Sequence, residues 1–458
     1  MSFTSPIFLF AFLPLVLLAE RALPGTQRKN WLLALAGLLF FSFGRLEYVL
    51  VLVGSAAVNY GLALLLRRSP RKSIAAVGVL VNLGILAACR RMALYSGHMS
   101  GLLSVAVFTM KGLSYLLDVY RGDIKSTERF FAVLFYMSFF PLVQAGPLLP
   151  YWEFEDWMLS RNVSAETTAA GVQRLIAGLG KKLLLGDTLG IAAAQVYGMY
   201  LAPDMDFRLA WVGCVCGALQ LYFVLSGYSD ISIGICKILG LDLSENYNYP
   251  YGALSLRDFW QRWNISLTAW MEDYLCRHIA NQGQLKRGLI GLCIFLCLGL
   301  WHGVGVSFAL WGLLNGILVL LEMGNIIPVQ RLSATAAGRV MCRVYMLLSV
   351  LVLSVLVQAG SLGNAWTMLT AMFGFAVSEQ GLYGLYTVMN GATTVVLVLS
   401  AVLSVGFARG LSNRMEKTPM WVQDTYMIGK RLGSIAVLLL CMMCLAQSSG
   451  VSVGYFGF

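Results

Sequence analysis

Charged side chains are scarce in this chain of 458 residues. Only 12% of its residues are Asp, Glu, Lys or Arg, whereas 58% are hydrophobic, and the mean hydropathy is +0.74. This composition excludes a soluble globular protein and indicates a protein that crosses a membrane several times. Acidic residues are the scarcer kind, with 22 against 33 basic ones, and no stretch interleaves basic with aromatic residues as a nucleic-acid groove would. We therefore expect no nucleic-acid partner.

Cysteine pairs at metal-binding or disulfide spacing are absent as well. Neither Cys214 with Cys216 nor Cys293 with Cys297 is joined by a second Cys or His pair, so we predict no disulfide framework and no metal site. No basic segment precedes the first apolar run at Pro6, and we interpret that run as a first span, not as a signal peptide. No internal repeat is visible, which argues against inverted-repeat transporters.

Long apolar runs occupy most of the chain. A bilayer core requires about 20 mostly apolar residues per helix. Runs of this kind fall near 6–23, 31–44, 47–66, 73–89, 101–118, 130–146, 183–201, 208–226, 285–301, 304–323, 341–360, 390–408 and 433–449. Because some of them are too short to cross alone, we predict an all-α polytopic membrane protein with roughly 11–12 transmembrane helices.

Basic clusters predict the orientation of these spans. The clusters include LLRRSPRKS (Leu65–Ser73), CRR (Cys89–Arg91) and IGKRLG (Ile428–Gly433). Basic residues are enriched in cytoplasmic loops. With Arg67–Lys72, Arg409–Lys417 and Lys430–Arg431 in the cytoplasm, the last span runs outward, and both chain ends are expected on the outer side.

The centre of the chain has a different pattern. From Trp152 to Lys182 and from Ser244 to Lys286, aromatic, charged and apolar residues mix at helical spacing, most clearly in RDFWQRWNISLTAWMEDYLCRHI (Arg257–Ile279). Helices of this kind lie at the membrane interface or dip into the protein. Irregular backbone at membrane depth is tolerated only inside protein or around a cavity, so we expect a cavity here.

One histidine lies in an apolar stretch, LGLWHGVGVSFALWG (Leu298–Gly312), where a charged group costs about 2.5–3.5 kcal/mol. It is His302, and Asn264 lies upstream in QRWNISL. A buried imidazole can take a proton from an attacking hydroxyl or thiol, and a carboxamide can orient the acyl carbonyl or the imidazole. Each residue also fits a structural role, as a neutral hydrogen-bonded histidine and as a satisfied interfacial asparagine. These residues alone leave both interpretations open.

A series of blocks in a fixed order carries a more specific signal. The blocks are SPIFLFAFLPLVLLAERAL, LSYLLDVYRG, SFFPLVQAGPLLPY, GLGKKLLLGD, LQLYFVLSGYSDISIG, ENYNYPY, RDFWQRWNISLTAW and LWHGVGVSFALWGLLNG. Together they resemble the membrane-bound O-acyltransferases, in the branch that includes the alginate O-acetyltransferases. The resemblance runs over nearly the full length of the chain.

The resemblance implies a ring of helices around a central tunnel, with His302 as the catalytic histidine at its narrowest point and Asn264 as its companion. It implies that further residues line or support the tunnel, namely Trp263, Ser266, Trp301, Ser229 and Asp230. The acyl donor would be acetyl-CoA or an acyl-carrier-protein thioester that enters from the cytoplasm as a substrate, with no bound cofactor. The acyl group would leave on the extracytoplasmic face.

The sequence departs from the family pattern at Asn264, at Lys111, and at Val224–Leu225, which replace the usual acidic–aromatic pair before Ser226. Asn264 stands where this branch usually carries a second histidine, which excludes a two-histidine mechanism. His278 either replaces that histidine or is an interfacial residue that faces the cytosol. Lys111 stands where a glutamine is common, and it either pairs with Asp118 or extends its amine to the membrane surface.

The tail VGYFGF (Val453–Phe458) resembles an aromatic ending of related enzymes. Tyr455 either folds back into the outer tunnel mouth and accepts the acyl group as a relay, or anchors the tail at the membrane interface.

We therefore expect one membrane domain over residues 1–458, with N-terminal spans (1–150), a catalytic core with re-entrant helices (151–325), and C-terminal spans with the aromatic tail (326–458). The expected enzyme moves a short acyl group, acetyl in the first place, across the plasma or inner membrane to a surface polysaccharide or cell-wall polymer. Because the chain contains no hydrolase-like domain, a separate extracytoplasmic serine acyltransferase or esterase-like partner is expected to finish the transfer. Two alternatives stay open: D-alanyl transfer to teichoic acid, and a transporter or flippase of a lipid-linked intermediate.

Overall fold

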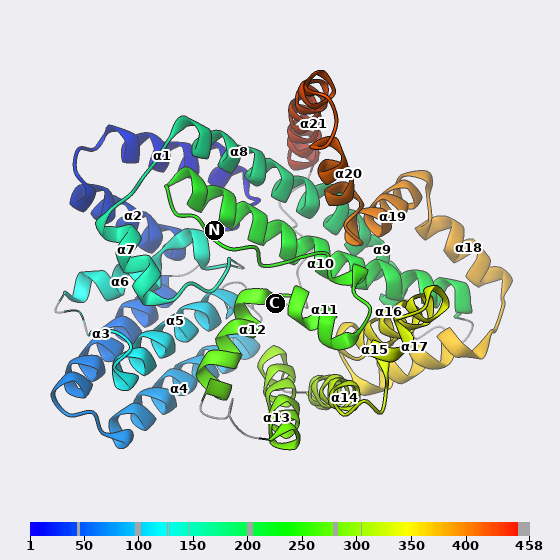
Figure 1. Ribbon diagram of the computed structural model, residues 1–458, viewed down its shortest axis with the longest axis horizontal. Coiled ribbons are helices and arrows are strands. Elements are labelled where there is room, and N and C mark those ends of the chain that lie inside the picture. The colour runs from blue at the N-terminus through cyan, green and yellow to red at the C-terminus, as the bar shows by residue number, and fades with distance from the viewer. Residues whose placement is uncertain are drawn as a thin grey trace.

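The computed structural model describes residues 1–43, 46–96, 102–125, 127, 129–144, 146–198, 205–277, 283–303 and 305–447 (Figure 1). Every regular element in these ranges is a helix, which confirms the predicted all-α class. The long helix α10 (Phe207–Ile238) runs across the middle of the molecule in Figure 1, with the N-terminal helices to its left and the C-terminal helices mostly to its right.

The N-terminal helices come first in the chain and pack mainly on one another. They are η1 (Phe8–Phe12), α1 (Leu13–Ala22), α2 (Thr26–Ser42), α3 (Leu46–Arg68), α4 (Lys72–Ser96), α5 (Leu102–Arg121), α6 (Phe130–Ser138), η2 (Phe140–Leu142) and α7 (Tyr151–Leu159).

The central and C-terminal helices follow. The central ones are α8 (Ala165–Leu179), η3 (Gly180–Gly186), α9 (Asp187–Gly198), α10, η4 (Pro250–Gly252), α11 (Leu256–Arg262), α12 (Ile265–Met271), η5 (Glu272–Cys276), α13 (Gln284–His302) and α14 (Val306–Met323). The C-terminal ones are α15 (Val329–Leu332), α16 (Ala336–Gln358), α17 (Leu362–Gly374), α18 (Glu379–Val388), α19 (Gly391–Ser404), α20 (Phe407–Met415) and α21 (Met420–Gln447).

Fewer helices are long enough to cross a bilayer than the sequence predicts. Within the described ranges, six helices have the length and apolar composition of a span, or seven if α18 and α19, which bend by 74°, form one broken span. The run 6–23 divides into η1 and α1, and the run 183–201 falls on η3 and α9, so these expected spans are short helical pieces. The structure therefore shows a polytopic membrane protein, while the full ring of 11–12 spans and its central tunnel stay predictions.

Glycines bring α8 and α10 into close contact. A Cβ atom at Gly178 would lie 2.6 Å from the Gly227 carbonyl oxygen, and one at Gly234 would lie 2.7 Å from the carbonyl oxygen of Gly171. Close backbone approach through small residues is a usual way to join helices in membranes, where lipid is as apolar as the core. This contact fixes α10, which carries part of the pocket described below.

Aromatic side chains fill the N-terminal part of the core. The N-terminal aromatic core consists of Phe3, Phe8, Phe12, Phe40, Phe135, Phe139, Phe140, Phe154 and Trp157, which are all buried. The Phe140 ring lies 5.3 Å from the Phe12 ring and 5.8 Å from the Phe40 ring, measured between centroids. These separations are typical of directly packed rings, so the aromatic side chains of this region are closely packed.

The buried Lys111 does not form the predicted ion pair with Asp118, and it does not reach the membrane surface. Its Nζ atom donates a hydrogen bond to the Tyr136 carbonyl oxygen at 3.1 Å, and the side chain is almost completely buried. Asp118 instead accepts a hydrogen bond from the Tyr274 hydroxyl at 2.7 Å. Both expectations for Lys111 were wrong because a backbone carbonyl lies within reach of its amine.

Candidate active site

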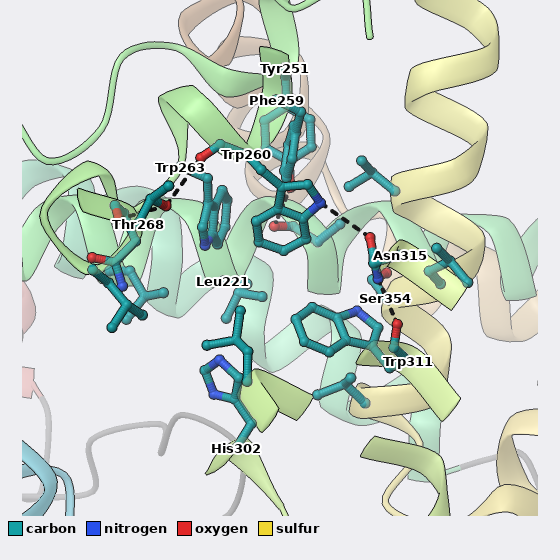
Figure 2. A pocket seen from close by; sticks show the side chains of 18 of the residues that line it. Leu221, Tyr251, Phe259, Trp260, Trp263, Thr268, His302, Trp311, Asn315 and Ser354 are labelled. Atoms are coloured by element: carbon teal, nitrogen blue, oxygen red, sulfur yellow. Dashed lines mark hydrogen bonds between the residues drawn. The ribbon is translucent and has the colours of Figure 1, made fainter. Parts of the chain in front are cut away.

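An apolar pocket lies where the central helices meet α16. Its cavity volume is about 90 Å³, and it is partly open to the outside. Its walls come from α10, η4, α11, α12, α13, α14 and α16, and Figure 2 shows the aromatic side chains that surround it. We call this cavity the aromatic pocket. Its lining is mostly apolar and carries a few polar groups, as is usual for small-molecule sites.

His302 is one of those polar groups. It is the last residue of α13 and lies at one end of the aromatic pocket in Figure 2. The imidazole ring packs edge-on against two indoles, with centroid distances of 4.8 Å to Trp301 and 5.8 Å to Trp311. Gly303 follows directly, and a Cβ atom there would lie 2.1 Å from the Phe308 ring. The glycine in the Trp-His-Gly sequence is thus required for the close turn between α13 and α14.

Asn264 also lines the aromatic pocket, in the break between α11 and α12. Its φ angle of 47° lies in the left-handed region, which asparagine tolerates better than most residues. The helical spacing predicted in this region is present as two helices, α11 and α12, with a break at Asn264 between them. The backbone turn moves α12 away from the line of α11 and places the amide at the pocket wall.

Three tryptophans form much of the pocket wall. Trp263 stacks on Phe259 at 5.4 Å between centroids with an interplanar angle of 21°. The Trp260 indole N–H donates to the Asn315 side-chain oxygen at 3.3 Å, and the Asn315 amide donates to the Trp311 carbonyl oxygen at 2.8 Å (Figure 2). The first bond holds the Trp260 indole against α14, and the second fixes the Asn315 amide on its own helix.

The sequence prediction missed Trp260, Trp311 and Asn315 as pocket residues. A signal was present, because Trp311 and Asn315 are four residues apart and therefore share one face of a helix. Trp260 likewise precedes Trp263 by three residues. The spacing does not show which face of each helix borders the cavity.

The other predicted site residues lie at different distances from the pocket wall. Trp263 lines the aromatic pocket, and Trp301 packs against His302 without lining it. Ser266 supports the break between α11 and α12, because its hydroxyl accepts a hydrogen bond from the Leu148 amide at 2.9 Å and donates to Asn246 at 2.9 Å. Tyr455 and His278 lie outside the described residues.

Ser229 and Asp230 are buried on α10 but do not line the aromatic pocket. Asp230 forms ion pairs of 2.7 Å with both Arg174 and Lys181, and Arg174 also binds Glu245. This cluster joins α8, η3 and the loop after α10. Asp230 therefore acts on the packing of the core and does not reach the pocket.

A second, polar cavity lies between α11 and α20. It holds about 930 Å³ of open space, and we call it the polar groove. The groove borders the face of α11 that carries Asp258 and Arg262, whereas Trp260 and Trp263 face the aromatic pocket. On the α20 side, Arg409 donates a hydrogen bond to the Asn248 side-chain oxygen at 2.7 Å. One short helix thus separates an apolar cavity from a polar one.

Apolar helices that surround a pocket with an imidazole and a carboxamide in its wall define a membrane enzyme with a site for an apolar or acyl-bearing substrate. Sequence comparison gives this class its family. The profile of MBOAT, the membrane-bound O-acyltransferase family, matches residues 124–358. This range includes all of the residues that line the aromatic pocket.

The individual relatives agree with that match. The chain is 30% identical over 402 residues to the probable alginate O-acetylase AlgI of Pseudomonas aeruginosa, covering 82% of this chain and 75% of the relative. It is 29% identical to the peptidoglycan O-acetyltransferase of Helicobacter pylori, covering 69% of each chain. It is 25% identical to the teichoic acid D-alanyltransferase of Bacillus subtilis, covering 47% of this chain and 58% of the relative. The chain belongs to the membrane-bound O-acyltransferase family and is an O-acyltransferase of the membrane.

Proposed function

We propose that this enzyme moves an acetyl group from a cytoplasmic thioester, acetyl-CoA or an acyl-carrier-protein thioester, to a polysaccharide or cell-wall polymer outside the plasma or inner membrane. The single observation that carries the proposal is that His302 and Asn264, which are far apart in the sequence, both line the aromatic pocket. The likeness to two O-acetyltransferases over more than two thirds of the chain supports acetyl as the group that is moved.

In the proposed reaction, His302 removes the proton from the acceptor hydroxyl while the hydroxyl oxygen attacks the thioester carbonyl carbon. A C–O bond forms, the C–S bond breaks, and the proton passes from the imidazole to the leaving sulfur. The Asn264 amide donates a hydrogen bond to the carbonyl oxygen, where negative charge develops. The apolar walls exclude water, which would otherwise hydrolyse the thioester.

The polar groove supports a thioester donor with a charged far end. Arg262 and Arg409 face this groove, and the sequence places the Arg409–Lys417 segment in the cytoplasm. Coenzyme A and the prosthetic arm of a carrier protein both join a phosphate to a slender arm with a terminal thiol. We propose that the phosphate end lies toward the groove, while the acyl end enters the aromatic pocket and a tunnel that continues from it to the outer face.

We propose that Tyr455 acts as an acyl relay and that a partner protein completes the transfer on the outer side of the membrane. The tail that carries Tyr455 follows α21 directly, so tethering would give its phenol an effective concentration near the millimolar range. An aryl ester on Tyr455 is activated, because a phenol with a pKa near 10 is a better leaving group than an alcohol. An extracytoplasmic serine enzyme would then take the acetyl group and pass it to the polymer.

Tyr455→Phe tests the relay. This variant keeps an aromatic side chain in the tail, and we expect it to insert normally, bind the donor, and lose polymer acetylation. Alkali-released acetate from the cell surface measures the outcome, with Phe456→Leu as the control in the same tail. Normal acetylation by Tyr455→Phe would leave the tail as an anchor and require direct transfer to the partner.

The test of the proposed function is a complementation experiment. Deletion of the gene should remove O-acetyl esters from one envelope polymer, and the wild-type gene should restore them, whereas His302→Ala should not. Mass spectrometry of the polymer also identifies the group that is lost. If D-alanyl esters are lost and acetyl esters are not, the result would support the D-alanyl alternative. An unchanged polymer with an accumulated lipid-linked precursor would indicate a transporter.

A further inference from the structure

A guanidinium group from the N-terminal helices holds the end of the helix that carries His302. The Nη1 atom of Arg90, near the end of α4, donates a hydrogen bond to the Trp301 carbonyl oxygen at 3.0 Å. Its Nη2 atom donates to the carbonyl oxygen of His302 itself at 3.2 Å. One half-buried side chain thus binds two consecutive carbonyl groups at the last turn of α13.

The end of α13 needs such a partner. The last carbonyl groups of a helix accept no hydrogen bond within the helix. The partial negative charge at this end of the helix also favours a nearby cation. After His302 the chain becomes extended at Gly303, whose amide still bonds to the Gly299 carbonyl oxygen at 3.1 Å. The two carbonyls that Arg90 binds are therefore those at which the helix stops.

The geometry favours arginine over lysine. A guanidinium group presents its N–H donors in a rigid planar fork, which can bind two acceptors at once and fix their relative orientation. A lysine amine is a compact charge on a flexible stem and does not impose that geometry. The sequence interpretation had assigned Arg90, within CRR, to a basic cytoplasmic cluster, whereas the structure directs its side chain to the backbone beside the imidazole.

We propose that Arg90 is a positioning residue that sets the orientation of the His302 imidazole. Since the fork fixes the carbonyls of Trp301 and His302, it limits rotation of the backbone that carries the ring, and the ring then packs between Trp301 and Trp311. The link also ties α4, an N-terminal helix, to the pocket. The effect on catalysis rests on the proposed role of His302, whereas the clamp on the backbone can be tested by itself.

The test compares Arg90→Lys and Arg90→Gln with Arg68→Gln, a change of an exposed arginine in the last turn of α3. The activity assay uses purified full-length protein in proteoliposomes and acetyl-CoA or an acetylated carrier protein, whichever the wild type consumes. We expect both Arg90 variants to lower kcat about 10- to 100-fold, since small misplacements of a catalytic group have effects of that size, with KM for the thioester unchanged. Arg68→Gln should leave both constants at the wild-type values.

A second readout does not depend on activity. The chain has three histidines, His98, His278 and His302, so carbethoxylation by diethyl pyrocarbonate can be followed at each by peptide mass spectrometry. We expect the Arg90 variants to carbethoxylate His302 several-fold faster than the wild type, with the rates at His98 and His278 unchanged. Arg90→Lys retains the positive charge that guides membrane insertion, so it separates a topological role from the clamp.

Wild-type kcat and a wild-type rate at His302 in folded Arg90→Lys and Arg90→Gln would overturn the proposal. Failure of both variants to insert or fold would also overturn it, because Arg90 would then serve assembly and not the site. If His302→Ala retains full activity, the proposed function fails, while the carbethoxylation rates still decide whether the clamp exists.

Discussion

Two aromatic regions of this protein have opposite interiors. In the N-terminal aromatic core, buried rings pack directly on one another, as the Phe140 contacts with Phe12 and Phe40 show. In the aromatic pocket, Trp260, Trp263 and Trp311 border a cavity of about 90 Å³. Aromatic side chains therefore pack closely in one region and border a cavity in the other.

The difference lies in the polar groups that accompany the rings. The described phenylalanines of the aromatic core have no polar atoms to satisfy, so close packing is their best arrangement. In the aromatic pocket, the hydrogen bond from Trp260 to Asn315 joins α11 to α14. We therefore infer that the first region stabilises the fold, whereas the second provides the space for a substrate that the proposed function requires.

The largest expected effect is on stability. Phe140→Ala should destabilise the protein by about 3–5 kcal/mol, because the surrounding rings cannot fill the space that it leaves. Activity per folded molecule should stay at the wild-type level. Thermal unfolding in detergent, with Phe10→Ala as the control, measures the effect, since Phe10 is 56% exposed on the neighbouring η1. A normal melting temperature with lost activity would contradict the division between the two regions.

Substitution of Asn264 should lower activity more than it lowers stability, which is the reverse of the effect at Phe140. Asn264→Gly removes the amide but permits the left-handed backbone, so we expect a normal melting temperature and a loss of about 1–3 kcal/mol of transition-state stabilisation, roughly 10- to 100-fold in rate. Asn264→Ala should add backbone strain of about 1–2 kcal/mol and melt earlier. Asn264→His should retain activity, because histidine tolerates this backbone conformation and the family resemblance implies a histidine at this position. Full activity of Asn264→Gly would remove the amide from the site.

The smallest effect is expected outside both aromatic regions. Arg409→Gln at the polar groove should raise the KM for the thioester donor several-fold and leave kcat unchanged, because an exposed charge contributes about 1 kcal/mol or less. The rise should disappear at high salt, where the charge is screened. Arg414→Gln, on the same helix but outside the groove lining, is the matched control. An unchanged KM would exclude the groove as the place of the charged donor end.

The sequence predicted those features that depend on local pattern. Low charge and long apolar runs were enough for the all-α membrane class, and the blocks around His302 and Asn264 were enough for the family. The two residues were expected to belong to one site, and both line the aromatic pocket. That they carry out catalysis stays a proposal.

Features that depend on distant contacts were beyond the sequence. The helical spacing of side chains continues from Phe259 to Tyr274, so the spacing does not show the left-handed turn that separates two helices at Asn264. Lys111 binds a carbonyl of α6, and no charge pattern shows where such a carbonyl lies. Asp230 stood beside family motifs, but its ion pairs turn it toward α8 and away from the pocket.

The central claim is that His302 in the aromatic pocket carries out the acyl transfer. Its most direct test is the rate of thioester cleavage in a single turnover by purified protein in proteoliposomes, with the acceptor partner present. The account predicts that His302→Ala lowers this rate by at least about 100-fold, with an unchanged melting temperature and unchanged donor binding. A His302→Ala protein that retains more than about a tenth of the wild-type rate would contradict it, because a general base contributes about 10²–10⁴-fold.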